Sequence, residues 1–278
     1  MIACPSVRKS SIRTHYNLAT LFYRLLWGPH IHHGYWTSDE SPRVAQLALT
    51  ERLATLARIK SGDSLLDIGC GMGGSSIHLA KTRRCQATGV TLSRVQRIWS
   101  ATSAAAQGVR RNTSFRCADA ETLEFEQAQF DVVWSVECTE HLFDKPAFFQ
   151  RAAQWLKPGG RMAICAWLAG DQLDTSARRQ QVYDVCDGFL CPSLGSSADY
   201  MEWMQRAGLR VERVEDWTAK VARTWEICRD RVRKTRVRWL ARCLHGESTL
   251  FLDRFDALLS AYETGAMKYG CFIATRDA

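Results

Sequence analysis

The stretch LLDIGCGMGG, residues 65–74, decides the fold of this chain. The short apolar run Ser64–Ile68 ends at these glycines, and a helical pattern, Gly74–Thr82, begins directly after them. Glycines let the backbone turn tightly and approach a ligand closely, and the free N–H groups at the start of a helix favour a carboxylate or a phosphate. The stretch therefore predicts a ligand-binding loop at the carboxyl end of a buried strand.

Short apolar runs alternate with amphipathic stretches around this loop. We predict strands at 64–68, 86–90, 113–117, 130–136 and 161–167, and helices at 74–82, 93–107 and 146–156. This alternation is typical of a parallel sheet covered by helices on both faces. A further strand is expected at 209–217 and a closing strand at 267–275. The fold prediction is thus a doubly wound, Rossmann-like α/β domain.

Helical segments flank this alternating core. They are predicted at 10–26, 42–58 and 197–207, and over most of 218–262 with a break at His245-Gly246, while 170–196 reads as an inserted cap. Because no repeat or linker interrupts the chain, we expect one domain over 1–278. Its parts would be lid helices at 1–60, a ligand-binding core at 61–168, and a cap with closing strands at 169–278.

The composition narrows the class of protein. Hydrophobic residues make up 46% and charged residues 24% of the 278, which is ordinary for a soluble globular protein. No apolar run approaches the roughly 20 residues that a membrane span needs, and residues 1–28 lack a signal-peptide core. We therefore expect a cytoplasmic protein. Eleven cysteines without a CxxC pair indicate neither a zinc ribbon nor a disulfide framework.

The glycine loop is compatible with two cofactors. Gly69, Gly71 and Gly74 also fit the GxGxxG pattern of dinucleotide-binding proteins, which place an acidic residue about 20 positions further on. No Asp or Glu lies between Ser75 and Ala118, although nearby basic residues could hold the 2′-phosphate of NADP. An acidic residue just before the glycines favours S-adenosylmethionine (SAM). An NADP-dependent oxidoreductase and a SAM-binding protein without activity remain the alternatives.

Several stretches carry a family resemblance. The motifs LLDIGCGMGGSSIHLA (65–80), GVTLSRVQ (89–96), CADAETLEF (117–125), FDVVWSVECTEHLFDK (130–145) and LKPGGRMAICAW (156–167) resemble, in order, those of class I SAM-dependent methyltransferases. Together with LLWGPHIHHGYW (25–36), SSADYMEWMQRAGL (196–209) and MKYGCFIATR (267–276), they resemble more closely the γ-tocopherol methyltransferase family. Sterol methyltransferases and cyclopropane fatty acid synthases are similar at a greater distance. The resemblance implies a seven-stranded sheet with an antiparallel last strand and helical cap elements.

The resemblance also implies where SAM binds. The expected cofactor residues are Asp67, Gly69, Gly71, Thr91, Leu92, Gln96, Asp119, Ala120 and Glu137. The class has an acidic residue near Thr91, which this chain lacks, so Gln96 is expected to contact the ribose in its place. An exposed helix residue without a ligand is the alternative for Gln96.

The candidate catalytic residues follow the fourth strand, where open α/β sheets place their ligands. Glu140 and His141 could remove a proton from a phenol or ring-carbon acceptor, whereas a nitrogen nucleophile needs little help. A structural or SAM-orienting function is the alternative for both. We expect a small lipophilic acceptor, such as a tocopherol-like phenol, an isoprenoid or an aromatic natural product. N-methylation of an aromatic amine or alkaloid is the alternative reaction.

The acceptor-binding residues are expected in the aromatic stretches. They are His33, Tyr35, Trp167, Tyr183 and Phe189, with Tyr16, Trp27 and Trp36 as further lid candidates. The histidines at 30, 32 and 33 do not share one helix face and have no carboxylate cluster beside them, so we expect no metal. Ordinary core packing is the alternative for each aromatic residue.

The net charge of +8 is concentrated in one segment, 223–242, which has eight basic and two acidic residues. Apolar residues recur at helical spacing along it: Val221, Trp225, Cys228, Val232, Thr235, Trp239 and Cys243. A solvated helix surface, peripheral contact of 221–243 with anionic membrane lipid, or binding of an anionic substrate would each explain the charge. We do not expect nucleic acid as a partner, because no known binding module accompanies the charge.

Overall fold

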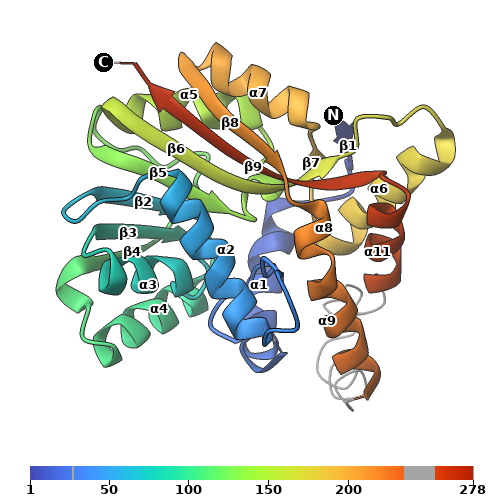
Figure 1. The fold of residues 1–278 in the computed structure, drawn as a ribbon, viewed down its shortest axis with the longest axis horizontal. Coiled ribbons are helices and arrows are strands. Elements are labelled where there is room, and N and C mark those ends of the chain that lie inside the picture. Colours follow the sequence, from blue (N-terminus) through green and yellow to red (C-terminus); the bar gives the residue numbers. More distant parts are fainter. Residues whose placement is uncertain (27, 235–253, 278) are drawn as a thin grey trace.

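The computed structural model describes residues 1–26, 28–234 and 254–277, and its centre is a seven-stranded sheet (Figure 1). The strand order is β4-β3-β2-β5-β6-β9-β8. The strands are β2 (Ser64–Ile68), β3 (Gln86–Thr91), β4 (Thr113–Cys117), β5 (Phe130–Val136), β6 (Leu156–Ala169), β8 (Leu209–Asp216) and β9 (Met267–Arg276). The pairings from β4 to β6 are parallel, and β9 runs antiparallel to both of its neighbours. The predicted fold class is confirmed.

One predicted strand boundary was wrong. The strand expected at 161–167 begins at Leu156, directly after a helix, and continues to Ala169. Its pairing with β5 is irregular, because Phe130 pairs with Leu156 whereas Val132 pairs with Arg161. The LKPGG stretch, expected as a turn before the strand, is therefore an irregularity within it, where Pro and Gly are tolerated.

Helices cover both faces of the sheet. They are α1 (Lys9–Leu26), α2 (Pro42–Leu56), α3 (Gly74–Thr82), α4 (Arg94–Ala106), α5 (Lys145–Trp155), α6 (Ser176–Phe189), α7 (Ser197–Arg206), α8 (Thr218–Val221), α9 (Arg223–Lys234) and α11 (Phe255–Glu263), with 3₁₀ turns η1 (Arg110–Asn112) and η2 (Thr139–His141). Side chains alternate between the faces of a strand. In β2, Leu65 packs in a core with α2, whereas Leu66 and Ile68 pack in a second core with α5 and α7. The predicted break at His245-Gly246 lies outside the described residues.

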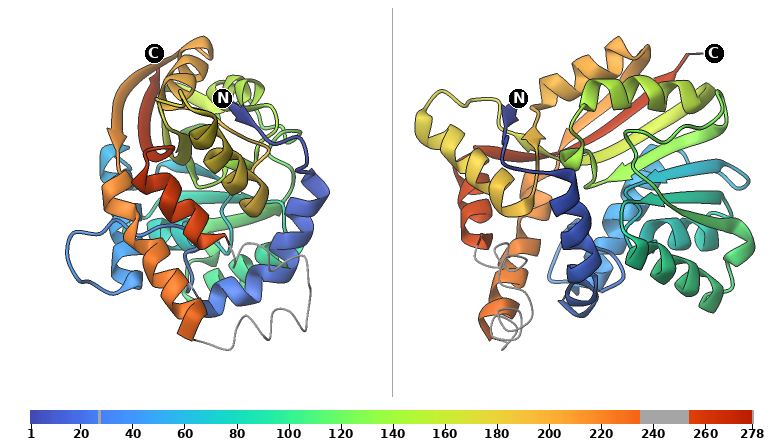
Figure 2. Two further views of the ribbon diagram at one scale, coloured as in Figure 1. Left: turned by 90° about the vertical axis from the view of Figure 1, so that its right-hand side faces the viewer. Right: turned by 180° about the vertical axis from the view of Figure 1, so that it is seen from behind.

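The cap helices gather at one end of the sheet, where α1, α6, α9 and α11 lie beyond the carboxyl ends of the parallel strands (Figures 1 and 2). A short strand that the sequence did not predict, β1 (Ile2–Ala3), pairs with β7 (Ser193–Leu194). This pairing fastens the chain before α1 to the segment after α6. Two distant parts of the cap are thereby held together over the site.

No helix among the described residues is long and apolar enough to cross a bilayer.

Candidate active site

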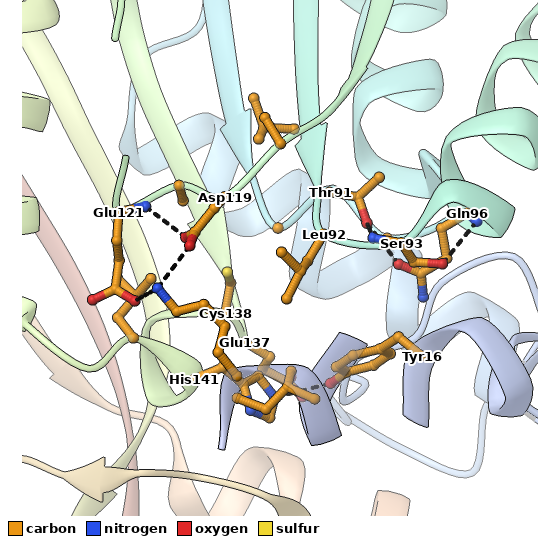
Figure 3. Close-up of a pocket in the computed structure, with 18 of the residues that line it drawn as sticks. Tyr16, Thr91, Leu92, Ser93, Gln96, Asp119, Glu121, Glu137, Cys138 and His141 are labelled. Atoms are coloured by element: carbon orange, nitrogen blue, oxygen red, sulfur yellow. Dashed lines mark hydrogen bonds and ion pairs between the residues drawn. The ribbon is translucent and has the colours of Figure 1, made fainter. Parts of the chain in front are cut away.

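A cavity of about 790 Å³, partly open to solvent, lies at the carboxyl ends of β2, β3 and β5 beneath α1 (Figure 3). Eight of the nine predicted cofactor residues line it: Gly69, Gly71, Thr91, Leu92, Gln96, Asp119, Ala120 and Glu137. The ninth, Asp67, is buried behind the loop and lines an adjoining hollow with Gly69 and Gly71.

One wall of this cavity is the junction between β3 and α4. The hydroxyl of Thr91 donates to Gln96 Oε1 at 2.8 Å, and the hydroxyl of Ser93 accepts from the Gln96 backbone N–H at the start of α4. Ser93 also donates to Asn17 Oδ1 of α1 at 2.7 Å. Gln96 is therefore buried and oriented by its neighbours rather than exposed. Its amide N–H₂ group makes no hydrogen bond to this cluster.

The opposite wall carries two carboxylates with one shared cation (Figure 3). Lys9 Nζ, from the first turn of α1, lies 2.7 Å from Asp119 Oδ2 and 2.6 Å from Glu121 Oε2. Burial lowers the pKa of Lys9, but the two carboxylates outweigh it and the net shift is upward. The sequence did not identify Lys9, because its partners are more than 100 positions away.

The glycine loop joins the two walls. Gly69 has a φ of +78°, and a Cβ there would collide with the Cβ and Sγ of Cys138. Gly71 has a φ of +53°, and a Cβ there would meet no atom within 4 Å, because the cavity begins at this point. A closely approached, glycine-lined backbone with open space before it fits the methionine end of SAM.

A second cavity, with about 590 Å³ of space, adjoins the first on the side of the cap helices. The two share four lining residues: Tyr16, Ile31, Glu137 and His141. Rings of Tyr23, Trp167, Phe189 and Trp225 form much of the remaining wall. Two joined cavities, one beside the glycine loop and one lined by aromatic rings and buried polar groups, suit the meeting of a cofactor with a second small molecule.

His141 stands at the boundary between the two cavities. Its Nδ1 lies 3.0 Å from the carbonyl oxygen of Leu190, which can only accept, so Nδ1 carries the proton. Nε2 is therefore unprotonated, and its lone pair accepts a hydrogen bond from the Tyr16 hydroxyl at 2.9 Å. Burial lowers the pKa of His141 to about 4, so the imidazole is neutral at pH 7.

Glu137 directly follows β5 and lies in the left-handed region, at φ +53°, which is rare for a residue other than glycine. Its Oε1 accepts from the His33 backbone N–H, His33 Nδ1 and the Tyr269 hydroxyl at 2.7, 2.9 and 2.8 Å. Its Oε2 accepts from Trp167 Nε1 at 3.2 Å. Burial raises the pKa of Glu137, but the contacts with His33 outweigh this, and the net shift is downward.

The same network fixes His33. The indole Nε1 of Trp225 can only donate, so His33 Nε2 accepts from it and Nδ1 carries the proton given to Glu137. His30 and His32 hydrogen-bond to each other at 3.2 Å, and His32 Nδ1 donates to the His33 carbonyl. The three histidines thus have protein partners. The structure, as far as it is described, contains no group of three His, Cys, Asp or Glu side chains that could hold a metal.

Glu140 has fewer hydrogen-bond partners than Glu137, although both side chains are buried. Its Oε1 accepts from the Trp167 backbone N–H at 2.8 Å, whereas Oε2 has no hydrogen-bond partner in the described structure. The side chain lines the second cavity with 2% of its surface exposed. Burial raises the pKa of Glu140 to about 8. One carboxyl oxygen is thus left for a molecule that enters this cavity.

Comparison with known proteins identifies the family. The model of the mycolic acid cyclopropane synthetase family matches residues 5–265. The chain is 30% identical to the chloroplastic tocopherol O-methyltransferase of Arabidopsis thaliana over 94% of this chain and 80% of that protein. It is 33% identical to the 27-O-demethylrifamycin SV methyltransferase of Amycolatopsis mediterranei, over 84% and 85% of the two chains.

The chain belongs to this family. It is a SAM-dependent methyltransferase. A cyclopropane synthase from Mycobacterium tuberculosis has the same fold, with a TM-score of 0.84 over 97% of this chain and 99% of that one at 18% identity.

Only some of the predicted acceptor residues of the methyltransferase lie at the second cavity. His33, Trp167 and Phe189 line the second cavity, and so do both predicted catalytic residues, Glu140 and His141. Tyr35 and Tyr183 line neither cavity. The ring of Tyr35 lies 5.0 Å from that of Trp217, beneath the Arg52 guanidinium.

Other lining residues of the methyltransferase were not predicted as acceptor-binding. Trp225 was identified only as part of the apolar stripe, and Tyr23 and Cys191 were not identified at all. The first part of the stripe, Val221, Trp225, Cys228 and Val232, is buried as its spacing predicts. Thr235, Trp239 and Cys243 lie outside the described residues, as does Trp27.

We expect the methyltransferase to bind SAM more weakly as the pH falls below about 7. Burial raises the pKa of Asp67 to about 7, although the Ser76 hydroxyl, 2.5 Å from Oδ2, lowers it. We predict from the sequence that Asp67 holds the ammonium group of SAM, which only the ionised carboxylate attracts. The affinity should therefore fall about tenfold per pH unit below that value. Calorimetry from pH 5.5 to 8 measures this, and Asp67→Asn should flatten the profile. A flat profile in the unaltered protein would contradict the assignment.

Proposed function

We propose that this methyltransferase transfers the methyl group of SAM to a small lipophilic acceptor, of the tocopherol-like phenol, isoprenoid or aromatic natural product type. The observation that carries this proposal is the second cavity, whose aromatic wall adjoins the cofactor cavity at His141 and Tyr16. The names of two relatives support it, because tocopherol and a rifamycin are both lipophilic ring compounds.

We assign SAM to the first cavity. The glycine loop and Asp67 would hold its methionine end, Thr91, Leu92 and Gln96 its ribose, and Asp119 with Ala120 its adenine. When bound, SAM supplies an electrophilic methyl group, so the protein has to align the acceptor and exclude water. α1 covers the cavity and contributes Lys9, Ile12 and Tyr16 to its lining, which serves the exclusion of water.

The protein must also take up a proton where the acceptor attacks through a hydroxyl. His141 Nε2 has the lone pair for this, and the Tyr16 hydroxyl, which donates to that nitrogen, lines both cavities with it. Tyr16 can accept the acceptor's proton while it passes its own to Nε2, so the phenol is restored. Burial raises the pKa of Tyr16 well above 10, which keeps it protonated at rest.

An assay with labelled SAM across phenols, sterols, prenyl diphosphates and aromatic amines tests the proposal. We expect turnover with lipophilic acceptors, and a loss of about a hundred- to ten-thousandfold for His141→Ala with hydroxyl acceptors. His78→Ala is the matched control, because His78 lies on α3 beside Glu51 and lines neither cavity. Methylation of hydrophilic acceptors alone would contradict the lipophilic acceptor, and full turnover by His141→Ala with a phenol would contradict the base.

A further inference from the structure

The second cavity lacks a cation, as far as the described residues show. Its lining includes two carboxyl groups, Glu137 and Glu140, and four histidines, but no lysine or arginine. Burial lowers the pKa of His15 and of His141 to about 4, and lowers that of His32 as well. His33 Nε2 accepts from the Trp225 indole N–H, so this nitrogen already has a protein partner. The described lining therefore offers an anionic group neither a lysine nor an arginine.

The basic residues of α9 do not add positive charge to the lining of the second cavity. Arg223 pairs with Asp39 at 2.7 Å, and Arg233 pairs with Asp256 at 2.9 Å, both at the protein surface. None of the basic residues described between 223 and 234 lines the cavity, although Trp225 of the same helix does. An anionic group entering the cavity would thus leave water without gaining a counter-charge from the described residues, which is unfavourable.

One polar atom in this cavity still needs a partner. Oε2 of Glu140 is buried and has no hydrogen-bond partner in the described structure, whereas Oε1 is held by the Trp167 N–H. All four hydrogen bonds of the neighbouring Glu137 are made to protein groups. Buried polar atoms in proteins are almost always paired. A polar atom of the bound molecule can supply the missing partner.

We propose that Glu140 Oε2 binds an uncharged polar group of the acceptor, a hydroxyl or an amine, and that this cavity excludes acceptors with an anionic group. This inference rests on the proposed function, which assigns the second cavity to the acceptor. It narrows the acceptor to an uncharged phenol, alcohol or amine on an apolar ring or chain. Prenyl diphosphates and other phosphate esters are excluded.

Binding to the protein saturated with S-adenosylhomocysteine tests the inference without turnover. The probes form two series, each with a hydroxyl compound, a hydrocarbon and a phosphate ester. The first series is 1-naphthol, 1-methylnaphthalene and 1-naphthyl phosphate. The second is geraniol, the corresponding hydrocarbon without the hydroxyl, and geranyl phosphate. By calorimetry, we expect the hydroxyl member of at least one series to bind at least tenfold more tightly than the hydrocarbon, and the phosphate esters not to bind. Phosphate esters that bind as tightly as the hydroxyl members, or hydroxyl members that all fail to bind, would overturn the inference.

Two variants separate recognition of the acceptor from support of the fold. In Glu140→Leu, the ratio of the affinity for the hydroxyl compound to that for the hydrocarbon, called here the hydroxyl preference, should fall close to one. Glu140→Gln should keep most of it, because an amide can still hydrogen-bond at the Oε2 position and accept from Trp167. Glu226→Gln, an exposed glutamate of α9, is the control and should leave the preference unchanged. An unchanged preference in a folded Glu140→Leu protein overturns the inference, and where that variant fails to fold, the comparison of probes on the unaltered protein decides.

The outcome also separates this inference from the proposed function. If lipophilic acceptors are methylated but Glu140→Leu keeps the hydroxyl preference, the function stands and the inference fails. If no lipophilic acceptor is methylated although the hydroxyl preference depends on Glu140, the cavity is correctly described and the proposed function fails.

Discussion

Gly69→Ala should reduce SAM affinity more than a hundredfold. The new Cβ would collide with the Cβ and Sγ of Cys138, and the left-handed φ of +78° adds about 1–2 kcal/mol of backbone strain. Relieving the collision requires the loop or Cys138 to move, and both line the cavity assigned to the cofactor. Titration calorimetry with SAM measures the loss, and circular dichroism reports whether the sheet remains folded.

Two other glycines provide matched controls. Gly108 has a φ of +76° and no atom within 4 Å of a Cβ, so Gly108→Ala adds the same strain without a collision and should leave SAM affinity unchanged. Gly71→Ala also meets no protein atom, but its Cβ faces the cavity, so it should weaken SAM binding while its stability resembles that of Gly108→Ala. Equal SAM affinities in all three variants would show that the glycine loop does not hold the cofactor.

The strands were predictable because their signals are local. The apolar runs ending at Ile68 and Val136 are buried between helices on both faces, so each reads as a continuous hydrophobic segment. The glycine loop was equally clear, since its conformation depends on residues within the loop. The prediction that β9 runs antiparallel came from the family resemblance and not from any pattern in residues 267–275.

The different tasks of Glu137 and Glu140 were not predictable from the sequence. The two residues are three positions apart, and both follow β5. Glu137 is paired by His33 and Tyr269, which are 104 and 132 positions away. Glu140 keeps one oxygen without a hydrogen bond because no such partner reaches it among the described residues. Only the folded chain brings four donors to one carboxylate and leaves an oxygen of the other unpaired.

The aromatic wall of the second cavity shows the same limit. Trp225 and Phe189 pack with ring centroids 5.3 Å apart, although 35 residues separate them in the chain and two strands lie between their helices. Helical spacing predicted that Trp225 is buried but not which rings it meets. Tyr35 is equally aromatic in the sequence, yet it packs on Trp217 and lines neither cavity. Aromatic content therefore located the rings of the second cavity only in part.

Glu137→Ala should lower the free energy of unfolding by about 3–5 kcal/mol, the range for breaking a buried charged network. The change leaves donors from His33, Tyr269 and Trp167 without an acceptor in a site that excludes water. The residue also gives up the contacts that hold its left-handed backbone in place. Urea denaturation at pH 7 measures the loss, and Glu226→Gln, at the surface, should stay within about 0.5 kcal/mol of the unaltered protein.

Glu137→Gln distinguishes the charge from the shape of this side chain. The groups facing the carboxylate, two from His33 and one each from Tyr269 and Trp167, are all donors, so an amide N–H₂ would oppose one of them. We expect this variant to lose about 2–3 kcal/mol although its volume is unchanged. The pKa of Glu137 is lowered by folding, so its contribution is present above the pKa of the unfolded chain and is lost as the pH falls through the folded value. The difference between Glu137→Gln and the unaltered protein should therefore shrink in acid, and a difference that is constant with pH would show that the carboxylate charge does not stabilise this fold.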